Sequence, residues 1–289
     1  MKFGISLPNN HGVASIRDLV GLAVRAEQLG FASVWVSEHL FHSSYVAERL
    51  GDKPYHEALT VLTAVACATE KVRLGTSVLV LPWHHPVRLA KQVASLDELS
   101  GGRVDLGLGV AQTDDEYRNL GVPFNRRGRI ADEMLDAMRA LWSQDIPKFE
   151  GEFFNFKELR FEPKPVQNPL PILIGGNSAV AMNRVRVRGN GWHALSQSPE
   201  QMRAGIETIG GAGLRHSVRT MLSMVDEPWS RPVTERRTMK GTSEELVAMA
   251  QAYADVGVEE IIIDGNTGDI DAATALFEQF KRDVIDALD

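Results

Sequence analysis

Short apolar runs alternate with longer amphipathic segments along the chain. Residues 2–7 are apolar enough to predict a strand, whereas in 16–29 apolar side chains recur every three or four positions, which predicts a helix. Gly30 predicts the end of this helix, because glycine favours the left-handed conformation of a C-terminal cap. The alternation continues to a last helix over 270–288. It predicts eight strands, at 2–7, 32–36, 73–79, 104–110, 171–174, 191–195, 218–225 and 260–263.

Consecutive apolar positions characterise these strands, as in 34–36 and 261–263. Such runs are typical of parallel strands that are covered on both faces, with crossover helices between them. We therefore predict an α/β protein in which residues 1–289 form one domain, a single (β/α)8 barrel. The segment at about 143–170 is rich in phenylalanine and proline and too short for a core of its own. We interpret it as an insertion between strands four and five.

Composition changes this picture little. Hydrophobic residues make up 44% and charged residues 24% of the 289 positions, which is ordinary for a soluble globular protein. The net charge of −7 argues against a general nucleic-acid binder, and we find no signal peptide or membrane-crossing segment. We expect a cytoplasmic protein without nucleic-acid or membrane partners. The one cysteine, Cys67, lies in an apolar run and predicts a buried helical thiol.

Catalytic residues of a (β/α)8 barrel lie where the strands end, in the loops that follow. Glu38 and His39 follow the second predicted strand and place a carboxylate beside an imidazole. The imidazole can donate a hydrogen bond to a ring nitrogen or carry a proton. The alternative is that Glu38 caps the next segment and His39 is an ordinary polar residue.

Glycines follow the fifth predicted strand, at Gly175 and Gly176, directly before a helical pattern. Backbone N–H groups at such a turn bind anions, although an ordinary tight turn has the same sequence. Helix capping boxes are predicted at 113–116, 198–201 and 242–245. The arginines that follow the glycine turn either add positive potential there or are solvated: Arg184, Arg186 and Arg188. His84 and His85 lack the spacing of metal ligands, so we expect no metal site.

Several motifs together resemble the bacterial-luciferase-like superfamily of flavin- and F420-dependent oxidoreductases. They are Gly-Thr-Ser-Val at 75–78, His-Pro-Val at 85–87 and Ala-Lys-Gln at 90–92, followed by the distinctive run over 95–109 and by 121–124, 127–129, 141–142, 161–167, 174–178 and 191–192. The resemblance covers nearly the whole chain and is weakest over 205–240. At 1–8, 35–40 and the third strand it is most similar to the F420-dependent branch.

The resemblance implies a (β/α)8 barrel with an isoalloxazine-type ring at the mouth formed by the carboxyl ends of the strands. It also implies a non-proline cis peptide between Ser77 and Val78 that presses against the ring, with His39 in contact with the ring. Gln112 aligns where some members carry a catalytic glutamate, so proton transfer would fall to His39, Glu38, water or the substrate. The other cofactor-binding residues it implies are Gly175, Gly176 and Asn177 at the phosphate tail, Gly191 and Trp192.

These residues lead us to expect an F420-dependent oxidoreductase that transfers hydride between the deazaflavin and a small organic substrate. Trp83 and the loop at 41–55 either shape the substrate pocket or simply pack. Two alternatives stay open: an FMN-dependent monooxygenase, and a cofactor-binding protein without catalysis, because glutamine at position 112 cannot exchange protons. By analogy with the family we expect a homodimer.

Overall fold

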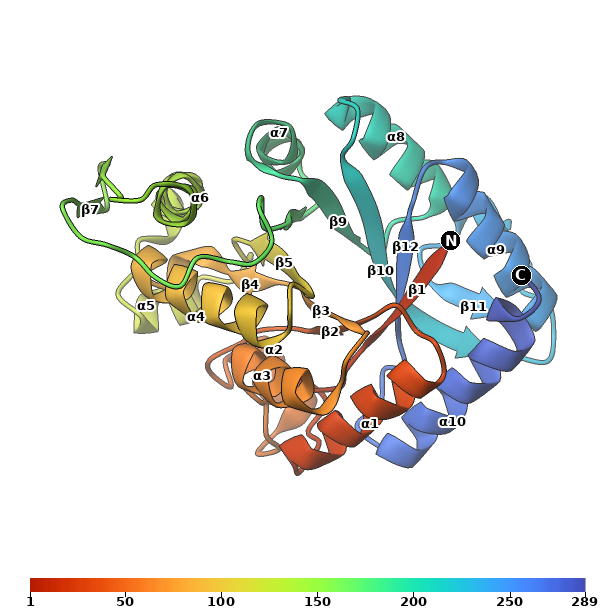
Figure 1. The fold of residues 1–289 in the computed structure, drawn as a ribbon. Helices are drawn as coiled ribbons and strands as arrows, with labels where there is room; N and C mark the ends of the chain where they lie inside the picture. Colours follow the sequence, from red (N-terminus) through yellow and green to blue (C-terminus); the bar gives the residue numbers. More distant parts are fainter. Residues whose placement is uncertain (289) are drawn as a thin grey trace.

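A closed ring of parallel strands forms the centre of the molecule. The computed structural model describes residues 1–288, and within them eight parallel strands pair in chain order, with the last strand returning to the first (Figure 1). The predicted (β/α)8 barrel is therefore confirmed. The barrel strands are β1 (Lys2–Ser6), β2 (Ser33–Val36), β3 (Arg73–Thr76), β5 (Val104–Gly109), β8 (Ile172–Gly175), β9 (Gly191–Leu195), β10 (Arg215–Met224) and β12 (Glu260–Asp264).

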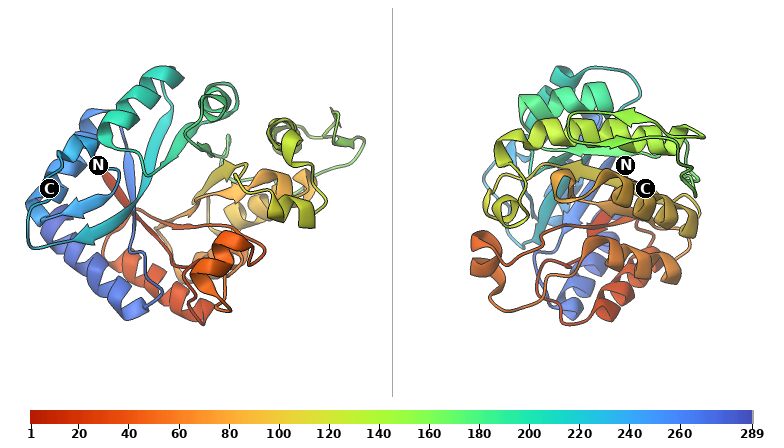
Figure 2. Two further views of the ribbon diagram at one scale, coloured as in Figure 1. Left: turned by 180° about the vertical axis from the view of Figure 1, so that it is seen from behind. Right: turned by 90° about the vertical axis from the view of Figure 1, so that its left-hand side faces the viewer.

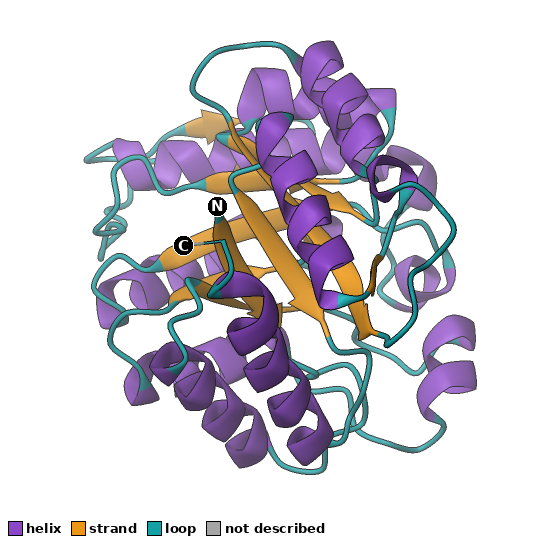
Figure 3. Ribbon diagram, turned by 90° about the vertical axis from the view of Figure 1, so that its right-hand side faces the viewer, coloured by secondary structure: helices purple, strands orange, loops and turns teal. Residues whose placement is uncertain are grey.

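Helices surround the ring on its outside (Figure 3). They are α1 (Ile16–Gln28), α3 (Ala58–Ala68), α4 (Pro86–Leu99), α6 (Arg127–Ser143), α7 (Ala179–Arg188), α8 (Pro199–Ile209), α9 (Ser243–Asp255) and α10 (Ile270–Phe280). Shorter elements lie in the loops: α2 (Ser44–Leu50), α5 (Asp115–Asn119), the 3-10 turns η1 (Leu81–Trp83), η2 (Phe124–Arg126) and η3 (Val233–Glu235), and the π-helical turn η4 (Lys281–Ile285).

Local signals at the helix ends agree with the sequence. Gly30 adopts a φ of +85° directly after the end of α1. Ser198 and Thr242 both form capping boxes at the starts of α8 and α9, as predicted. Within residues 1–288, no helix has the length and apolar character needed to span a bilayer.

The interior of the barrel is filled around one tryptophan. Trp35 is fully buried and forms a separate apolar cluster with Leu173 and Ile262. Two glycines leave the space that its indole occupies. A Cβ on Gly75 would lie 2.2 Å from Trp35 Cδ2, and a Cβ on Gly4 would lie 3.1 Å from Trp35 Nε1.

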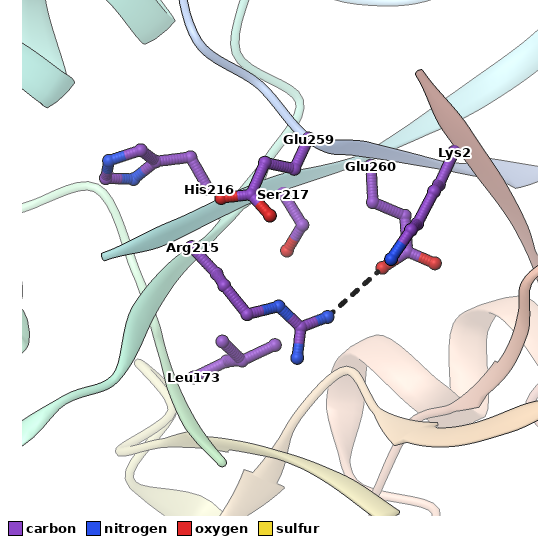
Figure 4. A pocket seen from close by; sticks show the side chains of 7 residues that line it. All are labelled: Lys2, Leu173, Arg215, His216, Ser217, Glu259 and Glu260. Atoms are coloured by element: carbon purple, nitrogen blue, oxygen red, sulfur yellow. Dashed lines mark ion pairs between the residues drawn. The ribbon is translucent and has the colours of Figure 1, made fainter. Parts of the chain in front are cut away.

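Ion pairs close the end of the barrel where the strands begin. Asp105 is fully buried and accepts hydrogen bonds from Arg73 Nε at 2.7 Å and Arg215 Nη1 at 2.7 Å. Burial alone would raise the pKa of Asp105, but the two arginines lower it below its usual value. A cavity of about 10 Å³, room for roughly one water, lies beside Arg215, Lys2 and Glu260 (Figure 4). This end therefore has no space for an organic ligand.

The predicted insertion lies between the fourth and fifth barrel strands, after α6. It contains a short antiparallel hairpin of β6 (Phe149–Glu150) and β7 (Asn155–Phe156), which lies at the outer edge of the molecule beside α6 (Figures 1 and 2). Glu133 of α6 holds this segment, because its carboxylate accepts the backbone N–H groups of Glu152, Phe153 and Phe154 at 2.7–2.8 Å.

Three details differ from the sequence prediction. The third strand is not continuous over 73–79: β3 ends at Thr76, and a separate β4 (Leu79–Val80) pairs with β5. A further short strand, β11 (Met239–Gly241), extends the sheet beside β10. Cys67 is exposed, so its prediction as a buried thiol was wrong. The core side of α3 is formed by neighbours such as Val65 and Ala66, which turns Cys67 toward solvent.

Replacing Gly75 with alanine tests the packing of Trp35. The added Cβ would overlap the indole ring, so we expect Gly75→Ala to lower the free energy of unfolding by about 1–3 kcal/mol. Gly21→Ala is the matched control, because Gly21 lies in α1 with no atom within 4 Å of an added Cβ. It should raise the free energy of unfolding by about 0.5–1 kcal/mol. Urea unfolding curves measure both, and equal stabilities for the two variants would contradict this packing.

Candidate functional site at the mouth of the barrel

The break in the third strand lies at the mouth of the barrel. The peptide between Ser77 and Val78 is cis, as the resemblance implied. The Val78 side chain extends over neighbouring strands, where glycines leave room for it. A Cβ on Gly109 of β5 or on Gly175 of β8 would lie 2.7 Å and 2.8 Å from the Val78 methyl groups. Gly107 leaves similar room, because its Cβ would lie 1.8 Å from the Thr76 carbonyl oxygen.

A buried cation supports Ser77 from the opposite side of the barrel. Arg219 of β10 is 8% exposed and donates from Nη1 to the Ser77 carbonyl at 3.1 Å. Its Nη2 donates to Asp264 at the end of β12, at 2.6 Å. Burial would raise the pKa of Asp264, but the charge and hydrogen bond of Arg219 lower it, so the pair is ionised. We had not identified Arg219 or Asp264 from the sequence, although charged residues within apolar strands are the pattern that marks them.

His39 is oriented by a carboxylate from another loop. Its Nδ1 lies 2.6 Å from Oε2 of Glu116, and Oε1 of Glu116 accepts the backbone N–H groups of Leu40 and Phe41. Glu116 is fully buried, whereas the His39 side chain is 23% exposed. An ionised carboxylate only accepts hydrogen bonds, so His39 carries a proton on Nδ1. Its Nε2 makes no hydrogen bond to residues 1–288 and is the nitrogen available to a ligand.

The contacts of Glu116 correct the capping box predicted at 113–116. The structure begins α5 at Asp115, with Asp114 at the N-cap and no side-chain cap. Glu116 does not reach back to the start of its own helix, because its carboxylate is occupied by His39 and the loop after β2.

Glu38 lies beside His39 in sequence but faces other partners. It is 4% exposed, and its Oε2 accepts the backbone N–H of Val80 at 2.7 Å. His84 Nε2 lies 2.9 Å from the other carboxylate oxygen. Glu38 thus joins the loop after β2 to β4 and to η1, and it does not meet His39 Nε2 as a second proton-exchanging group.

The turn after β8 lies beside the turn after β9. Gly176 has a φ of +112°, and its carbonyl accepts the indole N–H of Trp192 at 2.8 Å. The side chain of Asn177 donates to the Leu195 carbonyl at 3.0 Å. Arg237, which is exposed and which we had not identified from the sequence, donates to the Ser196 carbonyl at 2.8 Å. These contacts bring the N-termini of α7 and α8 and one cation to the same part of the mouth, which suits a phosphate.

The other predicted residues lie apart from this turn or behind it. Gly191 begins β9 and is therefore at the opposite end of the strand from the mouth. Trp192 is fully buried against Gly205 of α8, so it supports the Gly176 turn from behind. Gln112 is exposed in the loop after β5. Two of the arginines pair with acids of α6, Arg184 with Asp132 and Arg188 with Asp136. Arg186 stays exposed in the last turn of α7, at the other end of the helix from the glycine turn.

Apolar side chains face the space above Ser77. Leu195 and Met221 follow His193 and Arg219 by two positions on their strands, so they point inward, and they are 55% and 44% exposed. Trp83 is 9% exposed and packs against His39, and its indole N–H has no partner among residues 1–288. Exposed apolar side chains at the mouth fit a flat fused ring.

The closed barrel with its cis peptide after β3 agrees with the resemblance seen in the sequence, and sequence comparison identifies the family. The model of the luciferase-like monooxygenase family matches residues 1–225. The chain therefore belongs to the luciferase-like monooxygenase family.

Relatives with described cofactors fall on both sides of the flavin–deazaflavin division. The chain is 31% identical over 192 residues to an FMNH2-dependent dimethylsulfone monooxygenase of Pseudomonas putida, covering 65% of this chain and about half (51%) of that protein. It is 26% identical to an F420-dependent glucose-6-phosphate dehydrogenase of Amycolatopsis mediterranei, covering 94% of both chains. An uncharacterized protein of Mycobacterium tuberculosis is 32% identical over 194 residues, covering 63% of this chain and 67% of that protein.

Among solved structures, a monooxygenase from Streptomyces bottropensis superposes with a TM-score of 0.84. It covers the whole of both chains at 22% identity, which is a likeness of fold.

The pair of His84 and Glu38 predicts a pH dependence of stability. Burial lowers the pKa of His84, but the hydrogen bond and charge of Glu38 outweigh burial and raise this pKa above its usual value. The pKa of His84 is higher in the folded than in the unfolded protein. The stability that the His84–Glu38 pair contributes is therefore fully present below the unfolded pKa and is lost as pH rises through the folded pKa.

Unfolding curves of the wild type and of His84→Gln should therefore differ more at about pH 6 than at about pH 8.5. His85→Gln is the control, since the neighbouring His85 makes no ion pair within residues 1–288. If the free energies of unfolding of the wild type and His84→Gln differ by the same amount at both pH values, the ion pair adds nothing to the pH dependence of stability.

Proposed function

We propose that this chain is an F420-dependent oxidoreductase that transfers hydride between the deazaflavin and a small organic substrate. The observation that carries the proposal is the orientation of His39 by buried Glu116, which leaves one ring nitrogen for a substrate at the apolar mouth. Similarity to an F420-dependent dehydrogenase over 94% of both chains supports the choice of cofactor.

A bound deazaflavin supplies the ring carbon C5 that accepts or donates the hydride. His39 handles the proton. In the oxidising direction its Nε2 takes the hydroxyl proton of an alcohol while hydride leaves the carbinol carbon, and a carbonyl forms. The imidazolium that results is stabilised by the Glu116 carboxylate at 2.6 Å. In the reducing direction, His39 returns the same proton to the oxygen.

The remaining residues bind and orient. Val78 and its glycine neighbours would lie under the ring, and Gly175, Gly176, Asn177 and Arg237 would hold the phosphate. Leu195, Met221 and Trp83 exclude water from the reacting atoms. Gln112 would bind the cofactor through its amide and exchange no proton. Glu38 would position His84 and β4.

An FMN-dependent monooxygenase is the second candidate function. It is favoured by the 31% identity to a dimethylsulfone monooxygenase, which uses FMNH2. Assembly as a homodimer stays a prediction from the family.

Cofactor titration tests the proposal. Purified protein is titrated separately with F420 and with FMN, and binding is followed by the change in absorbance and fluorescence. We expect F420 to bind at least about tenfold more tightly, a free-energy difference of about 1.4 kcal/mol. The reverse preference would establish the monooxygenase. Tight F420 binding without turnover of alcohols, enones or imines would favour a binding protein.

Glu116→Gln tests the role of His39. The glutamine oxygen can still accept the N–H groups of Leu40 and Phe41, but its amide N–H₂ would face His39 Nδ1. Nδ1 must then accept, so the proton moves to Nε2, which can no longer take one from an alcohol. We expect kcat for alcohol oxidation to fall by about 100-fold, while the dissociation constant for F420 changes by less than about threefold.

The control for this variant is Asp115→Asn, because Asp115 is the adjacent acid and binds Ser44 rather than His39. Its kcat should stay within about twofold of the wild type. Equal kcat values for Glu116→Gln and the wild type would show that His39 does not transfer the proton.

A further inference from the structure

A second histidine lies inside the barrel, below the mouth. His193 of β9 is 2% exposed, and its ring stacks on Trp35 with centroids 4.6 Å apart and planes 7° apart. Both ring nitrogens meet hydroxyl groups. Nδ1 lies 2.8 Å from Ser217 Oγ on β10, and Nε2 lies 2.8 Å from Ser77 Oγ. One side chain therefore connects β9, β10 and the segment after β3.

The donors and acceptors in this network have a definite order. Arg219 can only donate, and its Nη1 lies 3.4 Å from Ser77 Oγ as well as 3.1 Å from the Ser77 carbonyl. With Arg219 donating to its oxygen, the Ser77 hydroxyl donates its own proton to His193 Nε2. A neutral imidazole has one acceptor nitrogen, so Nδ1 carries the proton and donates it to Ser217.

This arrangement needs a neutral imidazole, and the surroundings provide for it. Burial, reinforced by the charge of Arg219, lowers the pKa of His193 to about 3. Arg219 is itself held by Asp264, at 2.6 Å. His193 is thus neutral at neutral pH and acts there as a hydrogen-bond acceptor for Ser77.

We propose that His193 is a positioning residue, which fixes the Ser77 hydroxyl and thereby sets the position of the Ser77–Val78 segment beneath the cofactor ring. This inference rests on the proposed function for the ring itself. The hydroxyl of Ser77 is engaged by His193 and its carbonyl by Arg219, and its backbone N–H donates to the Val36 carbonyl. The Val78 side chain lies against Gly109 and Gly175, and both Ser77 and Val78 remain partly exposed.

The proton arrangement is measured in the protein without cofactor. Two-bond 1H–15N spectra of 15N-labelled protein should show His193 neutral, with its proton on Nδ1. A proton on Nε2, or a charged ring at neutral pH, would overturn the proposal. This result does not depend on which cofactor the protein binds.

The positioning role is measured with variants. His193→Phe keeps the ring on Trp35 but loses both hydrogen bonds, and it should weaken binding of the preferred cofactor by about tenfold. In His193→Gln the amide oxygen can accept from Ser77, so affinity should return to within about threefold of the wild type. Ser77→Ala should match His193→Phe, and the double variant should bind no more weakly than either single variant.

His216→Phe is the matched control. His216 is also buried, at 8% exposed, and burial also lowers its pKa, but it lines the small cavity at the opposite end of the barrel (Figure 4). Its cofactor affinity should equal that of the wild type, and unfolding curves show that each variant is folded. Unchanged affinity in His193→Phe and Ser77→Ala would overturn the proposal. If the wild type binds neither F420 nor FMN, the proposed function fails, and the spectra alone decide on His193.

Discussion

Clearance for the Val78 side chain is the constraint on which the mouth of this barrel depends. Its methyl groups occupy space that only glycine leaves open on β5 and β8, at Gly109 and Gly175. The preceding residue, Ser77, is held through its carbonyl by Arg219, which crosses the barrel from β10. Close packing of this kind gives the mouth one rigid surface, on which a flat ring can lie without rearranging the protein.

Much of the fold could be predicted because its signals are local. Consecutive apolar residues mark the eight strands, Ser198 and Thr242 mark helix starts, and the motif at 75–78 places the cis peptide through resemblance. Local patterns failed where one sequence motif is compatible with two different sets of contacts. Residues 113–116 have the form of a capping box, but Glu116 binds His39 instead, because the fold brings a better partner within reach.

The site depends on contacts between distant segments, which no local pattern contains. His39 and Glu116 are 77 positions apart, and Arg219 and Ser77 are 142 positions apart. The sequence placed His39 and Gly176 at the mouth because each follows a predicted strand, and the resemblance placed Val78 there. It could not show that Glu38 would bind His84, or that Arg219 would pair with Asp264. Burial and charge pairing decide those positions, and both depend on the closed barrel.

A crystal structure of the protein grown with F420 or FMN tests the central claim most directly. The account predicts a ring in contact with the Val78 side chain, His39 Nε2 directed at the substrate side, and the phosphate at the Gly175–Gly176 turn beside Arg237. A ring bound elsewhere on the barrel, or one that leaves Val78 uncovered while the phosphate avoids the Gly176 turn, would contradict it.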